Sequence, residues 1–224
     1  MNKPFSIAID GPAGAGKSTV ARALAKALDA MYLDTGAMYR AFGLSMLRMG
    51  VDIHDADAVA SHAGDNGITV DYVGGAQRIY IGAEDVTDAI RTPEVAEAAS
   101  ATSAVAEVRR EMVALQRRIA QGHNVIMDGR DIGTVVLPNA TLKVYLTASP
   151  EVRADRRCRE LRDKGAPQPY DQVLREIMDR DWRDMHREAS PLQVAEGAVV
   201  VDTSDMSLEA SVAALRALAE ETCV

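Results

Sequence analysis

The segment Gly11–Ser18 constrains this chain more than any other part of its sequence. Its residues follow the pattern G-x-x-x-x-G-K-[ST], which is typical of a phosphate-binding loop. The apolar run Phe5–Asp10 before it predicts a buried strand. The run Thr19–Leu28 after it is alanine-rich, lacks glycine and proline, and predicts a helix. A strand, a glycine-rich loop and a helix in this order predict that the chain binds a nucleoside triphosphate.

Each residue type in this loop has a chemical use. The glycines allow the backbone to turn its N–H groups toward a polyphosphate, and the helix N-terminus adds its positive dipole. We expect Lys17 to lie along the β- and γ-phosphates and the Ser18 hydroxyl to contact Mg²⁺. Ser18 is the only metal-binding residue that we predict. The predicted ATP-binding residues are Gly11, Pro12, Ala13, Gly14, Ala15, Gly16, Lys17, Ser18 and Thr19.

Composition and charge narrow the class of protein. The 224 residues are 47% hydrophobic, enough for one buried α/β core with an appendage. The two cysteines and four histidines have no redox or metal-binding spacing, so we expect neither a disulfide framework nor a protein metal cage. No leader pattern or membrane-length apolar run is found, which predicts a cytoplasmic protein without a membrane partner. The net charge of −8 argues against a nucleic-acid polymer as partner.

The charge is unevenly distributed. Residues 153–187 contain nine arginines and one lysine against eight carboxylates, whereas the rest of the chain is strongly acidic. A local concentration of arginine in an acidic protein suggests a small anionic ligand. A solvated helix surface is the simpler interpretation for most of these arginines.

The chain alternates between strand and helix patterns, as parallel α/β sheets do. After the first strand, further strands are expected at 31–34, 124–128, 141–146 and 198–202, with helices at 37–49, 55–63 and 207–220 and another beginning at Ser149-Pro150. We predict one domain over 1–224, of the α/β class. Its five-stranded parallel sheet would carry helices on both faces.

Two stretches interrupt the alternation. Residues 66–92 contain three short strand patterns, which predict a small antiparallel insert. Residues 153–169 end in the Gly/Pro-rich link Asp163–Pro169 and predict a short mobile lid. Between them, Thr92-Pro93 opens one long helix whose apolar positions, from Val105 to Ile119, recur every three or four residues.

Arginines follow two of the predicted strands. Arg40 lies just after the second strand and Arg130 just after the strand that ends at Asp128. Since the carboxyl ends of parallel strands meet at one edge of a sheet, both arginines are expected on the side of the phosphate-binding loop. Two arginines can clamp a phosphate by bidentate hydrogen bonds. The arrangement predicts a phosphotransferase whose acceptor is itself phosphorylated.

Five segments together resemble bacterial cytidylate kinases. They are the phosphate-binding loop, Asp34–Arg40, Arg91–Val95, Asp128–Thr134 and Arg180–Arg187, in this order over nearly the whole chain. The loop is generic, but Asp-Gly-Arg-Asp-x-Gly-Thr and Asp-Thr-Gly-Ala-x-Tyr-Arg are far more specific. The resemblance implies the fold of nucleoside monophosphate kinases. It implies one P-loop kinase domain over 1–224, in which residues 66–92 are a monophosphate-binding insert and residues 153–169 a lid. It also implies transfer of a phosphoryl group from ATP to CMP or dCMP, with Mg²⁺ and as a monomer.

The resemblance implies roles for single residues. Thr35, Arg40 and Arg130 would hold the CMP phosphate, while the cytosine would be read by Ser100, Arg109 and Asp131. Arg180 and Asp184 would contact the ribose and Arg187 a phosphate. The transferring phosphoryl group would be reached by one of Arg153, Arg156 and Arg157, and Asp202 and Thr203 would lie near adenine. The predicted CMP-binding residues are Thr35, Tyr39, Arg40, Ser100, Arg109, Arg130, Asp131, Gly133, Arg180, Asp184 and Arg187. The predicted catalytic residues are Lys17, Arg130, Arg153, Arg157 and Arg187.

Structural interpretations of these residues stay open. Asp131 could cap a helix or pair with Arg130, Ser100 could sit at a tight helix contact, and Tyr39 could serve packing. Two other functions also stay open. One is a P-loop kinase for a different small acceptor, such as shikimate, gluconate or dephospho-coenzyme A. The other is a nucleotide-dependent switch without transferase activity.

Overall fold

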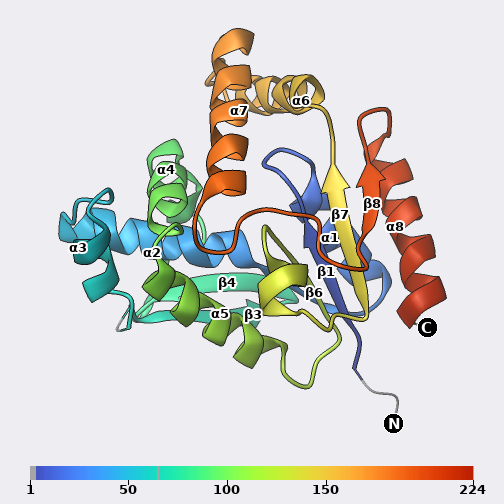
Figure 1. Cartoon of the computed structure of the whole chain (residues 1–224), viewed down its shortest axis with the longest axis horizontal. Helices are drawn as coiled ribbons and strands as arrows, with labels where there is room; N and C mark the ends of the chain where they lie inside the picture. The colour runs from blue at the N-terminus through green and yellow to red at the C-terminus, as the bar shows by residue number, and fades with distance from the viewer. Residues whose placement is uncertain (1–3, 65, 224) are drawn as a thin grey trace. The chain divides into compact units, whose positions relative to one another are not determined.

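The computed structural model describes residues 4–64 and 66–223. They form two compact units, residues 4–30 with 123–223 and residues 31–64 with 66–122. The larger sheet has the strand order β2-β6-β1-β7-β8 and the smaller sheet the order β3-β4-β5 (Figure 1). This confirms the predicted α/β class, with a five-stranded parallel sheet and a small antiparallel one. None of the helices in the described ranges is long and apolar enough to cross a membrane.

The first unit is built on a central strand that is buried along its length. β1 (Ser6–Asp10) pairs in parallel with β6 (Val125–Gly129) on one side and with β7 (Leu142–Thr147) on the other. β8 (Val199–Asp202) follows β7, also in parallel. Since Asp10 aligns with both Gly129 and Tyr145, β1 and β6 end at the same level, and β7 continues beyond them to Thr147. The side chains that follow these ends are therefore brought together.

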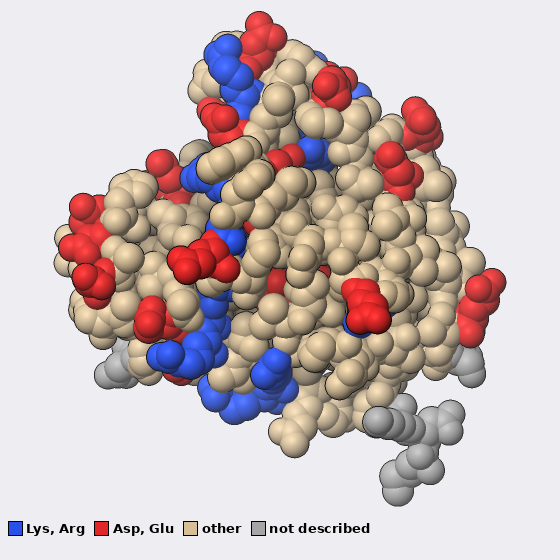
Figure 2. Space-filling model, in the orientation of Figure 1, with Lys and Arg blue, Asp and Glu red and all other residues tan. Residues whose placement is uncertain are grey.

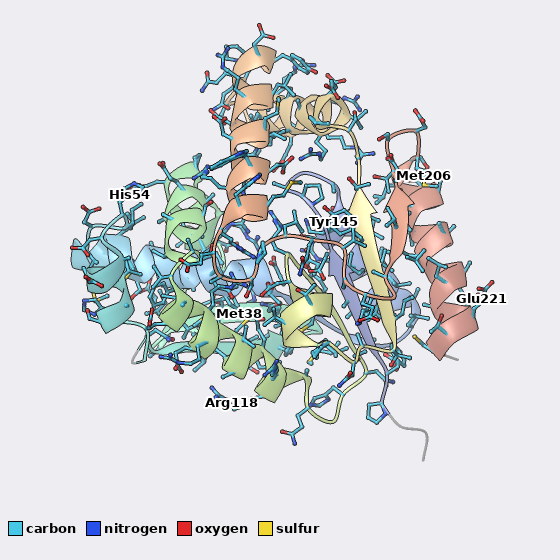
Figure 3. All side chains as sticks on the ribbon, in the orientation of Figure 1. Met38, His54, Arg118, Tyr145, Met206 and Glu221 are labelled. Atoms are coloured by element: carbon cyan, nitrogen blue, oxygen red, sulfur yellow. The ribbon has the colours of Figure 1, made fainter. Side chains whose placement is uncertain are left out.

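Helices cover this sheet because the apolar face of each helix packs on the apolar side chains of the strands. α1 (Lys17–Ala27) packs on β6 and β1 and against α8 (Leu208–Cys223), which also contacts β7. Glu221 marks the outer side of α8, away from the sheet (Figure 3). The short π-helical turn η2 (Ile132–Val136) packs on β1 and β6.

The arginine-rich region forms a helical hairpin beyond the end of β7 (Figure 1). It consists of α6 (Pro150–Asp163) and α7 (Tyr170–His186), which pack on each other. The hairpin has a small apolar core of its own, made of Ala154, Leu161, Val173 and Ile177. As predicted, α6 begins at Ser149-Pro150, where the Ser149 hydroxyl accepts the Val152 N–H at 3.3 Å.

The second unit contains the edge strand β2 (Met31–Asp34), the antiparallel sheet and five helical segments. The sheet has the three predicted strands, β3 (Ile68–Val73), β4 (Ala76–Ile81) and β5 (Glu84–Asp85). The helical segments are α2 (Thr35–Met49), α3 (Ala56–Ser61), η1 (Ala89–Arg91), α4 (Pro93–Thr102) and α5 (Ala106–Ala120). α2 and α4 pack closely because Gly43 has no side chain. A Cβ there would lie 2.7 Å from the Ala99 nitrogen.

The prediction of one long helix after Thr92-Pro93 is wrong. The segment forms α4 and α5, which are separated by Ser103–Val105. The hydroxyls of Thr102 and Ser103 donate to backbone carbonyls of the preceding turn, and the Arg109 guanidinium donates to the Ser103 carbonyl at 3.1 Å. These bonds replace the helical ladder at the break. The apolar periodicity of the sequence continues across this break, so the pattern did not indicate that the helix ends there.

Candidate active site

The backbone of the phosphate-binding loop requires its glycines. Gly11 has φ +147°, and a Cβ there would lie 1.9 Å from the Leu146 carbonyl oxygen, so no other residue fits. Gly14 and Gly16 also have positive φ, and Gly16 precedes α1 without a side-chain capping bond. The first turn of α1 contains no acidic residue. Its positive end therefore has no carboxylate of its own to neutralise it, which suits an anionic ligand.

The Lys17 ammonium is enclosed by this loop. Its Nζ donates to the Pro12 carbonyl at 2.7 Å, and the side chain is buried. Burial, and then the neighbouring Arg130 guanidinium, lower the pKa of Lys17 to about 7, while nearby carboxylates oppose this shift. A polyphosphate beside Lys17 would add to the negative charge of these carboxylates and so favour the charged ammonium.

Ser18 and Asp128 bring two side-chain oxygen atoms together beside the loop. The Ser18 hydroxyl donates to Oδ2 of Asp128 at 2.7 Å, and Asp128 is buried at the end of β6. Such hard oxygen donors fit Mg²⁺, which in nucleotide sites takes one or two protein ligands and completes its shell with phosphates and water. In the described part of the chain, no three His, Cys, Asp or Glu side chains form a metal cluster. Asp128 was not among our predicted site residues, although an apolar strand that ends in aspartate was a visible signal.

A cluster of ion pairs surrounds Arg130, which directly follows β6. Nε of Arg130 donates to Oδ2 of Asp184 at 2.7 Å, and Nη1 of Arg187 lies 4.0 Å from Oδ1 of the same carboxylate. Burial alone would raise the pKa of Asp184, but Arg130, Arg180 and Arg187 together hold it below its usual value. Burial likewise opposes the charge of Arg130, yet Asp184 raises the pKa of that guanidinium. Three of the arginines predicted for the acceptor side, Arg130, Arg180 and Arg187, thus surround the carboxylate of Asp184, which was also predicted there.

The three arginines proposed for the lid differ in their surroundings. Arg153 is 3% exposed and donates to the Ala148 and Ala13 carbonyls at 2.9 and 3.0 Å. Arg156 donates to the Thr203 carbonyl at 2.7 Å and to the Thr203 hydroxyl at 3.2 Å. Arg157 instead pairs at 2.9 Å with Glu160, an exposed partner on the same helix. Arg153 and Arg156 therefore tie α6 to the sheet and the phosphate-binding loop.

In the second unit, Asp34 organises the end of β2. Its Oδ1 accepts the Ala37 N–H at 2.9 Å, so α2 begins at Thr35, two residues before the predicted start. Its Oδ2 accepts from Arg91 at 3.3 Å, and its backbone N–H donates to the Gln77 side chain at 2.7 Å. The small sheet and η1 are thereby fastened to the strand end that precedes Thr35 and Arg40.

Arg109 is the central buried cation of this unit. It is 4% exposed and lies over the Tyr39 ring, 5.4 Å from the ring centroid. Its bond to the Ser103 carbonyl continues through the Ser103 hydroxyl to the Ser100 carbonyl at 3.0 Å. Tyr39, Ser100 and Arg109, which the sequence separates widely, thus form one group. The neighbouring Arg110 is exposed, as expected for a solvated arginine.

The segment after Arg130 differs from one structural alternative considered for Asp131, that of a helix cap. Asp131 precedes η2, but its side chain makes no capping hydrogen bond. The cap is supplied by Asp10, whose Oδ1 and Oδ2 accept the N–H groups of Ile132 and Gly133 at 2.8 and 2.7 Å. Burial raises the pKa of Asp10 to about 6 against the effect of these two bonds. Asp10 was not among our predicted site residues. The dipeptide Asp-Gly occurs both at the end of β1 and directly before Arg130, and this repetition was a visible signal.

Acidic side chains are scattered over the face of the molecule in Figure 2, in line with the net charge of −8. By contrast, the site around Lys17 and Arg130 in the first unit contains several cationic side chains. Its predicted members are Lys17, Arg130, Arg180 and Arg187, which are joined to Asp128 and Asp184 by the contacts above or by charge interactions. Thr19 is exposed on α1.

Comparison with known proteins agrees with this geometry. A family model described as cytidylate kinase matches residues 7–221. The cytidylate kinase of Caldanaerobacter subterraneus subsp. tengcongensis is 49% identical over 209 residues, covering 93% of this chain and 92% of the relative. That of Mycobacterium leprae is 50% identical over 202 residues, covering 90% and 89%. A crystal structure of shikimate kinase from Bacteroides thetaiotaomicron has a TM-score of 0.50 at 15% identity, over 96% of this chain and 98% of that one, and shows a shared fold.

Proposed function

The chain belongs to the cytidylate kinase family, and we propose how its residues divide the family's reaction, the ATP-dependent phosphorylation of CMP and dCMP. It is a nucleoside monophosphate kinase with ATP as co-substrate. The observation that carries the proposal is the enclosure of Lys17, the cation of the phosphate-binding loop, beside Arg130, an arginine that follows a neighbouring strand.

The donor side of the proposed site is the loop itself. Residues 11–19 would bind the ATP phosphates with backbone N–H groups and the uncapped N-terminus of α1. Lys17 would leave the Pro12 carbonyl and place its ammonium on the β- and γ-phosphates. Ser18 and Asp128 would hold Mg²⁺, which supplies charge neutralisation on the phosphate oxygens.

The acceptor side of the proposed site would use mainly charged groups. Arg130 would grip the CMP phosphate with the guanidinium edge that Asp184 leaves available, together with Thr35 and Arg40. Asp184, with Arg180, would contact the ribose, and Arg187 would add positive charge. Asp131 would accept from the cytosine amine and Arg109 would donate to its acceptors, with Ser100 beside them. Tyr39 supports Arg109 by lying under its guanidinium, and Gly133 supports the segment as a donor to Asp10.

The proposed mechanism needs no general base. A CMP phosphate oxygen is a competent nucleophile at neutral pH, so the residues have to align it in line with the transferred group and neutralise charge. Lys17, Arg130 and Arg187 would stabilise the equatorial oxygens. Of the α6 arginines, Arg157 would reach the phosphoryl group, since its partner Glu160 is exposed, whereas Arg153 would act by holding the loop.

Two regions complete the proposal. Residues 66–92 are the proposed monophosphate-binding insert, and residues 153–169 the proposed lid, within a kinase domain that covers 1–224. Closure of both would keep water from the phosphoryl group and so prevent ATP hydrolysis. We further propose that the chain works in the cytoplasm as a monomer, on free nucleotides rather than on a nucleic-acid polymer or a membrane.

One assay tests the function. ADP release would be followed with ATP, Mg²⁺ and one acceptor at a time: CMP, dCMP, UMP, AMP or shikimate. Fast release with CMP and dCMP, and much slower release with AMP and shikimate, is the expected result. Equal rates with shikimate, or ATP binding without any diphosphate product, would contradict it and favour another acceptor or a non-catalytic switch.

A further inference from the structure

The carboxylate of Asp10 has an unusual position for a protein that binds polyphosphate. It ends the central strand β1, immediately before the first glycine of the phosphate-binding loop, and the residue is 3% exposed. A buried anion there repels the nucleotide's phosphates, and burial raises the pKa of Asp10 to about 6. A residue with this cost must contribute something that a neutral side chain would not.

Its two oxygens make separate bonds to one short segment. Oδ1 accepts the Ile132 N–H at 2.8 Å and Oδ2 accepts the Gly133 N–H at 2.7 Å, at the N-terminus of η2. The packing leaves no slack. A Cβ on Gly133 would lie 3.3 Å from Oδ2 of Asp10 and 3.2 Å from the Ala195 Cβ. Two charge-assisted bonds on two oxygens fix both the height and the orientation of the segment.

The segment between β6 and η2 contains residues that we propose to bind the acceptor, CMP. The chain leaves the sheet at Gly129, which pairs with Asp10, and re-enters regular structure at Ile132. Arg130 and Asp131 are the two residues between these points. Their backbone is therefore held at both ends by contacts with the last residue of β1. The bonds of Asp10 go to the backbone of this segment, so its effect on substrate would pass through the position of Arg130 and Asp131.

We propose that Asp10 is a positioning residue that aligns the acceptor-binding segment Arg130–Asp131 with the phosphate-binding loop. The proposal rests on the proposed function of Arg130 and Asp131. In this proposal one residue sets the position of the CMP-binding segment relative to the ATP-binding loop. Asp10 can do so because it is joined covalently to the loop and by hydrogen bonds to the segment. Small misplacements of this kind cost large rate factors in phosphoryl transfer.

The test compares Asp10→Asn with the wild-type chain. Asparagine keeps one acceptor oxygen but turns an N–H₂ group toward a backbone N–H, so one of the two bonds is lost. We expect kcat/KM for CMP to fall by on the order of 10²-fold. The ATP Kd measured without CMP should stay unchanged, and amide exchange at Ile132 and Gly133 should accelerate. A weakened ATP Kd with an equal loss of CMP turnover would show that Asp10 serves the loop alone and would overturn the proposal.

A double-mutant cycle makes the test independent of overall destabilisation. If Asp10 acts through Arg130, Asp10→Asn should cost much less in an Arg130→Lys background than in the wild type. Independent losses that multiply would contradict the proposal. Asp55→Asn is the matched control, since Asp55 also accepts a backbone N–H, from Ala58, but on the exposed helix α3. It should leave kcat/KM unchanged.

A second variant keeps the experiment decisive if Asp10→Asn does not fold. Gly133→Ala retains the carboxylate but pushes a methyl group against it, and should lower kcat/KM for CMP in the same selective way. A normal kcat/KM in this variant would overturn the proposal. A wild-type chain that did not phosphorylate CMP would instead contradict the proposed function, and the amide-exchange comparison would still show whether Asp10 anchors η2.

Discussion

Arg153 and Asp181 form a buried ion pair that joins α6 to α7, with Nη2 of Arg153 2.6 Å from Oδ2 of Asp181. The same guanidinium donates to the Ala13 carbonyl inside the phosphate-binding loop and to the Ala148 carbonyl at the start of α6. One side chain thus connects the helical hairpin with the loop. A buried arginine with three acceptors loses much more than one bond when its charge partner is removed.

We therefore expect Asp181→Ala to lower the free energy of unfolding by about 3–5 kcal/mol, because it leaves the Arg153 charge buried and uncompensated. It should also weaken ATP binding through Ala13. Urea unfolding and ATP titration measure the two effects. The double variant Arg153→Met with Asp181→Leu should recover much of the stability but not the ATP affinity. Equal stability of Asp181→Ala and wild type would refute this view of the pair.

Replacing Lys17 separates catalysis from stability. Lys17→Met removes the ammonium from the transferring phosphates, and kcat should fall by at least about 10²–10³-fold. Since the buried ammonium is desolvated and its pKa is lowered to about 7, methionine should leave the melting temperature unchanged or raise it. Steady-state kinetics and a thermal melt check both effects. Retained turnover would show that the loop does not bind the reacting phosphates.

Lysine should not replace Arg130. The guanidinium donates through Nε to Asp184 and through Nη1 to the Gly129 carbonyl, and in our proposal its remaining N–H groups bind a phosphate. A lysine ammonium cannot serve all these partners in one plane. Arg130→Lys should raise KM for CMP and lower kcat, with ATP binding in the absence of CMP near normal. The control is Arg110→Lys, an exposed arginine, which should behave as wild type. A selective loss of ATP affinity would place Arg130 on the donor side instead.

The pair Ser18–Asp128 predicts how the enzyme depends on Mg²⁺. Chelation of the metal should abolish turnover, and both Ser18→Ala and Asp128→Asn should raise the Mg²⁺ concentration required for half-maximal rate. Rates measured across a Mg²⁺ titration at constant ATP test this. Ser61→Ala removes a hydroxyl on the exposed face of α3 and is expected to leave the titration unchanged. Unshifted Mg²⁺ curves for both site variants would place the metal elsewhere.

Asp131 should control the choice of pyrimidine. Uracil presents a carbonyl where cytosine presents an amine, so it would point an acceptor at the Asp131 carboxylate. A mismatch of buried polar groups costs up to roughly 10⁴–10⁵-fold in specificity, and less in a partly wet pocket. Asp131→Asn, which can donate as well as accept, should lower activity with CMP and narrow the CMP-to-UMP ratio. Measuring kcat/KM for both acceptors decides it, and an unchanged ratio would make Asp131 structural.

Local patterns predicted most of the fold because their causes are local. The strands around the phosphate-binding loop, the meander at 68–85 and the capped start of α6 follow from apolar runs, glycine pairs and a Ser-Pro cap. The break between α4 and α5 did not follow, since it depends on Arg109 reaching back to the Ser103 carbonyl. Asp34 as a cap of α2 was missed for a similar reason, because strand and helix meet there without a loop.

The sequence by itself determined that this chain has a P-loop with Lys17 and Ser18, that arginines follow its strands, and that its motifs are those of the cytidylate kinase family. Each of these depends on residue type at a fixed spacing along the chain. Only the tertiary structure decided that Arg153 is held by Asp181 and Ala13, and that Asp10 rather than Asp131 caps η2. These partners lie far apart in sequence, and a buried charge takes whichever donors or acceptors the packed strands bring within reach, which no linear pattern records.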